Sequence, residues 1–405
     1  MKNIFRKGLT LLMVLCLLVP LFGVSVLAKN TGELPIDYQF KAVDAPDPDR
    51  AQVLAADMTN DPYSSRQWGM KMIGMEAAWQ SGLTGEGVRV AIIDTGVSTQ
   101  TRDIDPDRLL TGKSFVDGVD STEDTMGHGT FVAGIIGATK DNGIGIAGIA
   151  PGVTIIPLRT STDGKSKDKL GTAAVYAAVD DFDCDIINIS YGSKYPQTGM
   201  REALQHAISK GVIVICAGGN SGDESLFYPA AFPEAIGVGG VNKYLEKSSF
   251  SHTNNSIFVT APGNDIVSLN LTNGAVREAN GSSYSTPVVT GIAALLREAH
   301  PEMTNDQFKE ILKASCWDLG DEGYDTTFGW GLVQAPKAIL KAAEYFGTAA
   351  PDMPEIPDPA PEPPPEPTPD PGSSWGIWDL FNFDWLRELF QNIIRSLFKG
   401  WNLSF

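Results

Sequence analysis

The sequence has few cysteines and a deficit of basic residues. Four Cys among 405 residues exclude a small protein built on a disulfide framework. Lys and Arg total 31 against 49 Asp and Glu, a formal net charge of −18, so the basic footprint of a nucleic-acid-binding protein is missing. No uncharged apolar run of about 18 residues follows the extreme N-terminus, which excludes a protein with several membrane spans. Apolar residues make up 42%, enough for a sizeable globular core.

Residues 1–28 have the features of a secretory signal peptide. A basic start is followed by an apolar stretch from Leu9 to Leu27, and Val26-Leu27-Ala28 fits a signal-peptidase site. An uncleaved N-terminal anchor is the alternative. We therefore expect a secreted or extracellular protein, with a peripheral position at the outer membrane surface of the cell as the second option.

Three cysteines remain after such a cleavage, and an odd number allows at most one pair within the chain. Their apolar surroundings favour small buried hydrophobic residues over a disulfide. They are Cys184, Cys216 and Cys316.

Short apolar runs alternate with helical patterns between residues 62 and 346. The runs Val88–Ile93, Ile186–Ile189 and Val212–Ile215 are rich in β-branched residues and bounded by Gly or Asp, as buried parallel strands are. A helical pattern over Met200–Ser209 lies between two of them. Strand, helix and strand in this order predict an α/β fold with a parallel sheet.

Three short motifs place polar side chains where such a fold has its active sites. Asp94 follows the first strand directly, at the carboxyl end where α/β sheets bind ligands. His128, between two glycines, opens a helical run. Ser283 lies in the segment Gly281–Pro287, which opens another helix with a proline expected in its first turn.

Asp, His and Ser together are the parts of a nucleophilic triad. A serine hydroxyl is a weak nucleophile, so a histidine must take its proton while an aspartate holds the imidazole tautomer. Each motif alone is weak evidence, since a single strand-end Asp or a single His is more often structural. All three in this order predict a serine hydrolase.

These motifs, with Asn188-Ile189-Ser190 and Gly218–Gly222, resemble the subtilisin-like serine proteases, most closely the thermitase-type members, over about residues 59–346. The family's chain order is Asp, His, Ser. The resemblance implies a three-layer α/β/α subtilisin-like domain over residues 61–346 with a mostly parallel central sheet. It also implies a serine endopeptidase, acting on proteins or peptides, with a monomeric catalytic domain.

The family pattern assigns roles to individual residues. Ser283 is the nucleophile rather than its neighbours Ser282 and Ser285, and Asn220 supplies a side-chain N–H to the oxyanion. The substrate would lie as an added strand between two segments. These segments are Gly164, Lys165, Ser166 and Lys167 on one side, and Ser190, Tyr191 and Gly192 on the other.

Two departures from the family bear on specificity. Lys165 and Lys167 stand in a segment that is commonly rich in Gly and Ser, so either substrates with acidic residues are preferred or the lysines point into water. Phe227 stands where a small residue is common at the floor of the primary specificity pocket. It predicts a preference for small side chains, unless the loop is aligned differently.

The resemblance also implies a structural Ca²⁺. Side-chain oxygens and backbone carbonyls would together give about six hard ligands. A tight glycine loop without metal is the alternative. The predicted ligands are Asp61, Asp103 and Asn142 through side chains, and Thr139, Ile144 and Ile146 through carbonyls. The remaining histidines, His206, His252 and His300, match no motif and are interpreted as structural.

The ends of the chain are not explained by the family domain. Residues 29–60 are too few for the usual folded pro-domain, so they are a short inhibitory strand, or the enzyme matures by another route. Residues 347–374 are a spacer rich in Pro and acidic residues, since 351–371 hold 11 of the 26 Pro. Residues 375–405 are an aromatic segment for which an amphipathic helix is predicted from Asp384 onward; this suits a membrane surface, a protein partner, or packing on the catalytic domain.

Two other functions stay open at this point. One is a dedicated processing protease that trims a single exported precursor. The other, of a different class, is a non-catalytic binding protein on the protease fold. The complete set of Asp94, His128, Ser283 and Asn220 argues against the second.

Overall fold

The computed structural model describes residues 39–43, 59–164 and 168–354. The predicted signal peptide, most of the spacer and the C-terminal helix lie outside these residues, as do Lys165, Ser166 and Lys167. The chain divides into two compact units, Met1–Glu362 and Pro363–Phe405, and every described residue belongs to the first. No helix within the described ranges is long and apolar enough to cross a membrane.

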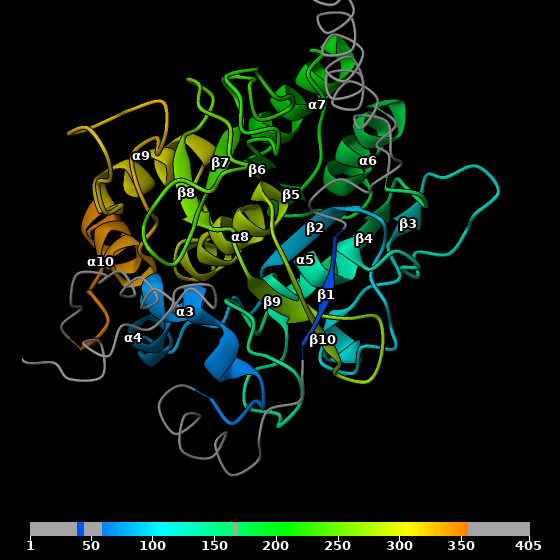
Figure 1. Cartoon of the computed structure of the whole chain (residues 1–405), viewed down its shortest axis with the longest axis horizontal. Helices are drawn as coiled ribbons and strands as arrows, with labels where there is room; N and C mark the ends of the chain where they lie inside the picture. Colours follow the sequence, from blue (N-terminus) through cyan, green and yellow to red (C-terminus); the bar gives the residue numbers. More distant parts are fainter. Residues whose placement is uncertain (1–38, 44–58, 165–167, 355–405) are drawn as a thin grey trace, which may run out of the picture. The chain divides into compact units, whose positions relative to one another are not determined.

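A seven-stranded sheet, parallel throughout, runs through the first unit in the order β3-β4-β2-β5-β6-β7-β8 (Figure 1). The three strands predicted from apolar runs are confirmed as β2, β5 and β6, within two residues at each end. The strands are β2 (Arg89–Asp94), β3 (Lys113–Ser114), β4 (Thr154–Arg159), β5 (Ile186–Ile189), β6 (Ile213–Ala217), β7 (Ile236–Val241) and β8 (Val259–Pro262).

Helices cover both faces of this sheet, and the helix predicted at Met200–Ser209 is confirmed as part of α7. Two short 3₁₀ turns, η4 (Ser64–Arg66) and η5 (Pro106–Arg108), accompany them. The helices are α3 (Trp68–Met72), α4 (Met75–Gln80), α5 (His128–Gly137), α6 (Asp168–Asp180), α7 (Thr198–Ser209), α8 (Ser282–Ala299), α9 (Asn305–Ser315) and α10 (Ala335–Phe346).

The central strand β2 shows why the fold has three layers. Successive side chains of a strand point to opposite faces of the sheet. Val90 and Ile92 pack in an apolar cluster with residues of α5 and α8, whereas Ala91 and Ile93 pack in a second cluster with residues of α6 and α7. Since both faces are buried, the strand is apolar throughout rather than alternating. This confirms the predicted α/β/α architecture.

The start of α8 differs from the prediction. The helix begins at Ser282, so Pro287 lies inside it and not in its first turn. Gly281 has φ of 154°, which lets the chain turn into the helix before the serines. Pro287 lacks the N–H that would bond the carbonyl of Ser283. The Ser190 hydroxyl donates to that carbonyl instead, at 2.8 Å, and so joins α8 to the residue that follows β5.

A second, antiparallel sheet of three strands lies beside α5 (Figure 1). It consists of β1 (Lys41–Ala42), β10 (Val276–Ala279) and β9 (Ile266–Leu269), in that order. β1 belongs to the predicted N-terminal extension and pairs with β10, with Lys41 opposite Glu278. The β9–β10 hairpin therefore connects the N-terminal extension to the segment that leads into Ser283.

The three cysteines of the described ranges are free thiols. Cys184 and Cys216 are buried, and burial raises the pKa of both thiols. Burial also raises the pKa of the Cys316 thiol. Their interpretation as buried apolar side chains is confirmed for Cys184 and Cys216.

The packing of α9 can be tested at Phe308, which is fully buried in the cluster beside α8. We expect Phe308→Ala to lower the free energy of unfolding by about 3–5 kcal/mol, because it removes apolar contacts and leaves a cavity. Glu310→Ala, on the exposed side of the same helix, should change it by no more than about 0.5 kcal/mol. Urea unfolding followed by tryptophan fluorescence measures both. A Phe308→Ala value as small as that of the control would contradict this packing.

Candidate active site

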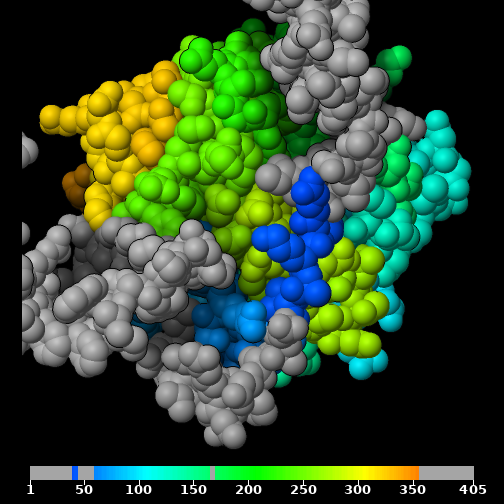
Figure 2. Space-filling model, viewed as in Figure 1, coloured from blue at the N-terminus to red at the C-terminus, as the bar shows by residue number. Residues whose placement is uncertain are grey.

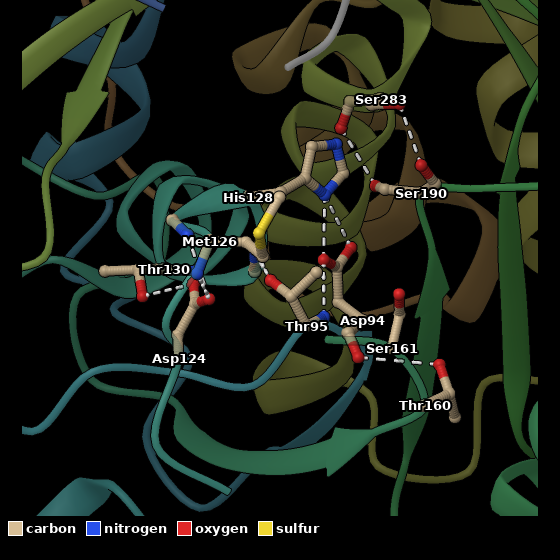
Figure 3. A network of polar contacts seen from close by, with 12 residues as sticks. Asp94, Thr95, Asp124, Met126, His128, Thr130, Thr160, Ser161, Ser190 and Ser283 are labelled. Atoms are coloured by element: carbon tan, nitrogen blue, oxygen red, sulfur yellow. Dashed lines mark hydrogen bonds and ion pairs between the residues drawn. The ribbon is translucent and has the colours of Figure 1, made fainter. Parts of the chain in front are cut away.

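Asp94 and His128 meet in the interior of the molecule (Figure 3). β2 ends at Asp94 and α5 begins at His128, and the two side chains are 2% and 1% exposed. His128 Nδ1 lies 2.8 Å and 2.9 Å from the two carboxylate oxygens of Asp94. A carboxylate only accepts hydrogen bonds, so Nδ1 carries a proton, and in the neutral ring Nε2 presents its lone pair. Ser283 lies beside the ring on the edge away from Asp94.

The motifs around Asp94 and His128 are built to approach each other closely. The Gly129 N–H donates to the Thr95 hydroxyl at 2.9 Å. A side chain at Gly129 would place Cβ 2.1 Å from the carbonyl oxygen of Gly96, so only glycine fits there. The Asp-Thr-Gly and Gly-His-Gly-Thr sequences thus form one packed contact between a strand end and a helix start.

Asp124 is a residue of this site that the sequence analysis missed. Its buried carboxylate accepts the N–H groups of Met126, Gly127 and Thr130 at 2.8–2.9 Å, and the Thr130 hydroxyl at 2.7 Å. These groups flank His128, so Asp124 fixes the turn that carries it. Asp124 lies three residues before Gly127, the N-cap of α5, which is outside the positions where a capping carboxylate is expected from sequence.

Ser283 and Ser190 bind each other reciprocally. The Ser283 hydroxyl donates to the Ser190 carbonyl at 2.7 Å, and the Ser190 hydroxyl donates to the Ser283 carbonyl at 2.8 Å. Asn188 extends this link, because its amide donates to the Ser190 hydroxyl and its oxygen accepts from Thr290 of α8, both at 2.9 Å. The Asn-Ile-Ser sequence therefore joins β5 to α8 through buried polar contacts.

Asn220 lies against the residue before Ser283. Its Oδ1 accepts from both the backbone N–H and the hydroxyl of Ser282, each at 2.8 Å. A backbone N–H can only donate, so the amide oxygen must face Ser282 and the Nδ2 hydrogens face away from it. Ser283 itself lies in the first turn of α8, where N–H groups have no carbonyl one turn back.

The predicted substrate segment Ser190, Tyr191 and Gly192 continues from β5, and the next residue, Ser193, pairs with the loop that carries Phe227. Ser193 and Tyr228 exchange backbone hydrogen bonds of 2.8 Å and 2.7 Å. The ring of Phe227 lies so close to Gly192 that a Cβ there would be 2.6 Å from it. A shallow hollow next to this pair is lined by residues that include Tyr191, Gly192 and Tyr228. Of the other segment, only Gly164 is described.

The six predicted calcium ligands gather around the loop 139–146. Asp61 accepts the N–H groups of Asp141 and Asn142 at 2.9 Å and 3.0 Å. Asp103 accepts from Asn142 Nδ2 at 2.8 Å and from the Ile146 N–H at 2.9 Å. Its backbone carbonyl accepts from Thr139. Ile144 donates its N–H to Asn142 Oδ1 at 2.7 Å.

The charges in this loop suit a cation. Asp61 and Asp103 are both fully buried. Burial raises the pKa of both carboxyls, that of Asp103 to about 7, and the neighbouring charge of Asp61 contributes to the second shift. Two buried carboxylates are the hard oxygen ligands that Ca²⁺ prefers. Asn142 would have to turn its oxygen toward the ion. Over the described ranges there is no cluster of three His, Cys, Asp or Glu that could hold a metal.

Sequence and structure comparisons agree on the family. The model of the Subtilase family matches residues 85–331. Subtilisin BL of Lederbergia lenta is 36% identical over 274 residues, which cover 67% of this chain and 97% of that protein. M-protease of Shouchella clausii is 36% identical over 272 residues, 67% of this chain and 69% of that protein.

Two further relatives define the extent of the match. The minor extracellular protease Epr of Bacillus subtilis is 35% identical over 288 residues, 69% of this chain, but the match spans only 43% of Epr. A solved protease from Pseudoalteromonas arctica superposes with a TM-score of 0.64 at 26% identity, covering 70% of this chain and 99% of that one. These matches do not test the thermitase-type subgroup, which stays a prediction. The family model and the subtilisin relatives together show that the chain belongs to the subtilase family of serine endopeptidases.

Proposed function

We propose that this protein is an exported serine endopeptidase that cleaves peptide bonds through Asp94, His128 and Ser283. The observation that carries the proposal is the buried His128, whose Nδ1 faces both oxygens of Asp94 while Ser283 lies at its other edge. Export is proposed from residues 1–28, and the similarity to Epr, a minor extracellular protease, supports it.

The reaction follows from these positions. Ser283 Oγ attacks the scissile carbonyl carbon while His128 Nε2 takes its proton. Asp94 stays ionised and stabilises the imidazolium that forms. His128 then gives the proton to the leaving amine, the C–N bond breaks, and an acyl-enzyme remains. Water, deprotonated by His128, attacks the acyl-enzyme and releases the second product.

The oxyanion of each tetrahedral intermediate needs donors that are already oriented. Asn220 supplies Nδ2, because Ser282 holds its oxygen on the opposite side, and the backbone N–H of Ser283 supplies the second donor.

A non-catalytic binding protein would not need this orientation of Asn220. A dedicated processing protease uses the same chemistry on one precursor, and substrate profiling separates it from a general endopeptidase. The preference for acidic substrates through Lys165 and Lys167 stays part of the proposal.

Loss of the side-chain donor tests this mechanism. We expect Asn220→Ala to lower kcat about 10²–10³-fold with little change in KM, a magnitude established for the oxyanion donor of a subtilisin. Ser285→Ala, a buried serine of the same helix outside the reacting groups, should keep kcat within about twofold. Steady-state hydrolysis of a peptide p-nitroanilide measures both variants. An unchanged kcat in Asn220→Ala would contradict the assignment.

We also propose that Ca²⁺ binds between Asp61, Asp103 and the loop 139–146. Bound calcium would offset the repulsion between the two buried carboxylates and so stabilise the native state; it takes no part in peptide cleavage. The raised pKa of both carboxyls in the metal-free fold supports a cation here.

The calcium proposal predicts that Asp103→Asn makes the protein less stable than the wild type when calcium is present but not when a chelator removes it. Calcium at 100 times its Kd should stabilise the wild type by about 2.7 kcal/mol. Asp103→Asn should remove this gain, yet be no less stable than the wild type in chelator because it removes a buried charge. Asp141→Asn, a loop carboxylate outside the predicted ligand set, should keep the gain. Thermal unfolding of each variant in the Ser283→Ala background, with calcium and with EDTA, decides it. Equal calcium responses in all three proteins would contradict the site.

For the N-terminal extension, we propose the inhibitory-strand alternative. Figure 2 shows residues 39–43 on the surface beside the β9–β10 hairpin. Because β1 runs antiparallel to β10, its N-terminal end points toward Ser283. Phe40 packs on Phe131 of α5, with ring centroids 5.6 Å apart, and the Arg277 guanidinium lies 4.4 Å from the Phe40 centroid. Phe131 in turn contacts Tyr284, the residue after Ser283.

This strand can be loosened without touching the triad. We expect Phe40→Ala to raise the initial hydrolysis rate of the chain that still carries residues 29–60, because the strand loses its main apolar contact. Lys41→Ala, which removes an exposed ion pair with Glu278, should have a smaller effect. The rates are compared on protein whose intact mass shows the extension in place. Equal rates in wild type and Phe40→Ala would contradict an inhibitory role.

A further inference from the structure

His252 occupies an unexpected place for a histidine that matches no motif. It lies in the loop between β7 and β8, and its side chain is fully buried. The ring packs directly on the main chain of Gly219, where a Cβ would lie 2.5–2.7 Å from three ring atoms. Gly219 also has φ of 113°, so a side chain is excluded twice over. The residue that follows Gly219 is Asn220.

Both ring nitrogens of His252 bond the loop that carries Asn220. The Ser221 N–H lies 3.0 Å from Nε2, and Nδ1 lies 2.8 Å from the Ser225 carbonyl. The N–H can only donate and the carbonyl can only accept. His252 is therefore neutral, with its proton on Nδ1 and a lone pair on Nε2.

Asn220 is consequently held from both sides. On one side, the Gly219 N–H donates to the Ser282 hydroxyl at 3.1 Å, and Ser282 binds the Asn220 oxygen. On the other side, His252 binds the Ser221 N–H. We propose that His252 is a positioning residue for peptide cleavage, which holds the Gly219–Ser221 backbone so that Asn220 is aimed at the oxyanion. This inference rests on the proposed endopeptidase function.

The same geometry makes the loop sensitive to acid. A proton on Nε2 would face the Ser221 N–H, so the hydrogen bond would be lost. Burial lowers the pKa of His252 below that of a free histidine, which keeps the ring neutral near pH 7. The charges that face the ring are Asp223, 3.8 Å from Nε2, and the cations Lys194 and Lys247. Asp223 pairs with Lys194 at 2.9 Å, so its charge is already matched.

The decisive experiment measures whether His252 acts through Asn220. His252→Leu removes both hydrogen bonds but keeps an apolar side chain, and we expect it to lower kcat about 10- to 100-fold with KM nearly unchanged. In the Asn220→Ala background, His252→Leu should lower kcat less than about threefold, because the donor that His252 positions is already absent. His252→Gln, which can accept from Ser221 and donate to Ser225, should restore most of the lost kcat. His206→Gln is the control, since that ring bonds Asp180 at the surface.

The outcomes separate this inference from the proposed function. An inactive, folded wild type would refute the endopeptidase itself. The positioning role alone would be overturned if the wild type is active and His252→Leu lowers kcat by the same factor in the wild-type and Asn220→Ala backgrounds. It would also be overturned if His252→Leu leaves kcat unchanged.

A second measurement decides the matter if His252→Leu does not fold. Protonation of His252 should lower kcat by the same 10- to 100-fold, so over the pH range in which His252 titrates log kcat of the wild type should fall more steeply than the slope of about 1 that His128 alone gives. His252→Gln should fall with a slope of about 1, because only His128 still titrates. Identical acid limbs in these two proteins would overturn the proposal.

Discussion

The contact between Asp94 and His128 is the constraint on which the rest of this site depends. A carboxylate that is almost completely buried costs free energy unless a partner binds both of its oxygens, and His128 Nδ1 does so at 2.8 Å and 2.9 Å. The pair forms only if the end of β2 meets the start of α5. The glycine at position 129, the Thr95 hydroxyl and the Asp124 carboxylate all serve that approach.

Hydrogen bonds between buried polar groups also position the nucleophile and the oxyanion donor. α8 begins at Ser282, and the interior proline leaves the Ser283 carbonyl for Ser190 to bind. That exchange anchors the first turn of the helix to the end of β5. Asn220 is then fixed by Ser282 on one side and by the loop bonded to His252 on the other. The reacting groups thus come from separate elements, and buried hydrogen bonds hold Asp94 to His128 and Ser283 to Ser190, which gives these groups the fixed orientation that catalysis requires.

The parallel sheet and its helices could be predicted from the sequence, because apolar runs and helical periodicity are local signals. The strands β2, β5 and β6 and the helix α7 lie where the pattern predicted them. The predicted start of α8 lies too late in the chain, because Pro287 is expected in a first turn and instead lies inside the helix. The Ser283 carbonyl that the proline leaves free binds the hydroxyl of Ser190, 93 positions before Ser283. Asp124 was not identified because it lies before the first residue of α5, although its partners are only two to six positions away. His252 was interpreted as structural because it matches no motif, and its bonds to Ser221 and Ser225 join segments about 30 positions apart, which no local pattern contains.

The central claim is that Ser283 is a nucleophile activated by His128. Fluorophosphonate labelling followed by intact-mass measurement tests it most directly, using folded wild type, Ser283→Ala and Ser285→Ala with the N-terminus of each identified. We expect one phosphonyl group on the wild type and on Ser285→Ala, located at Ser283, and none on Ser283→Ala. Labelling that persists in Ser283→Ala, or a folded and matured wild type that takes no label, would contradict it.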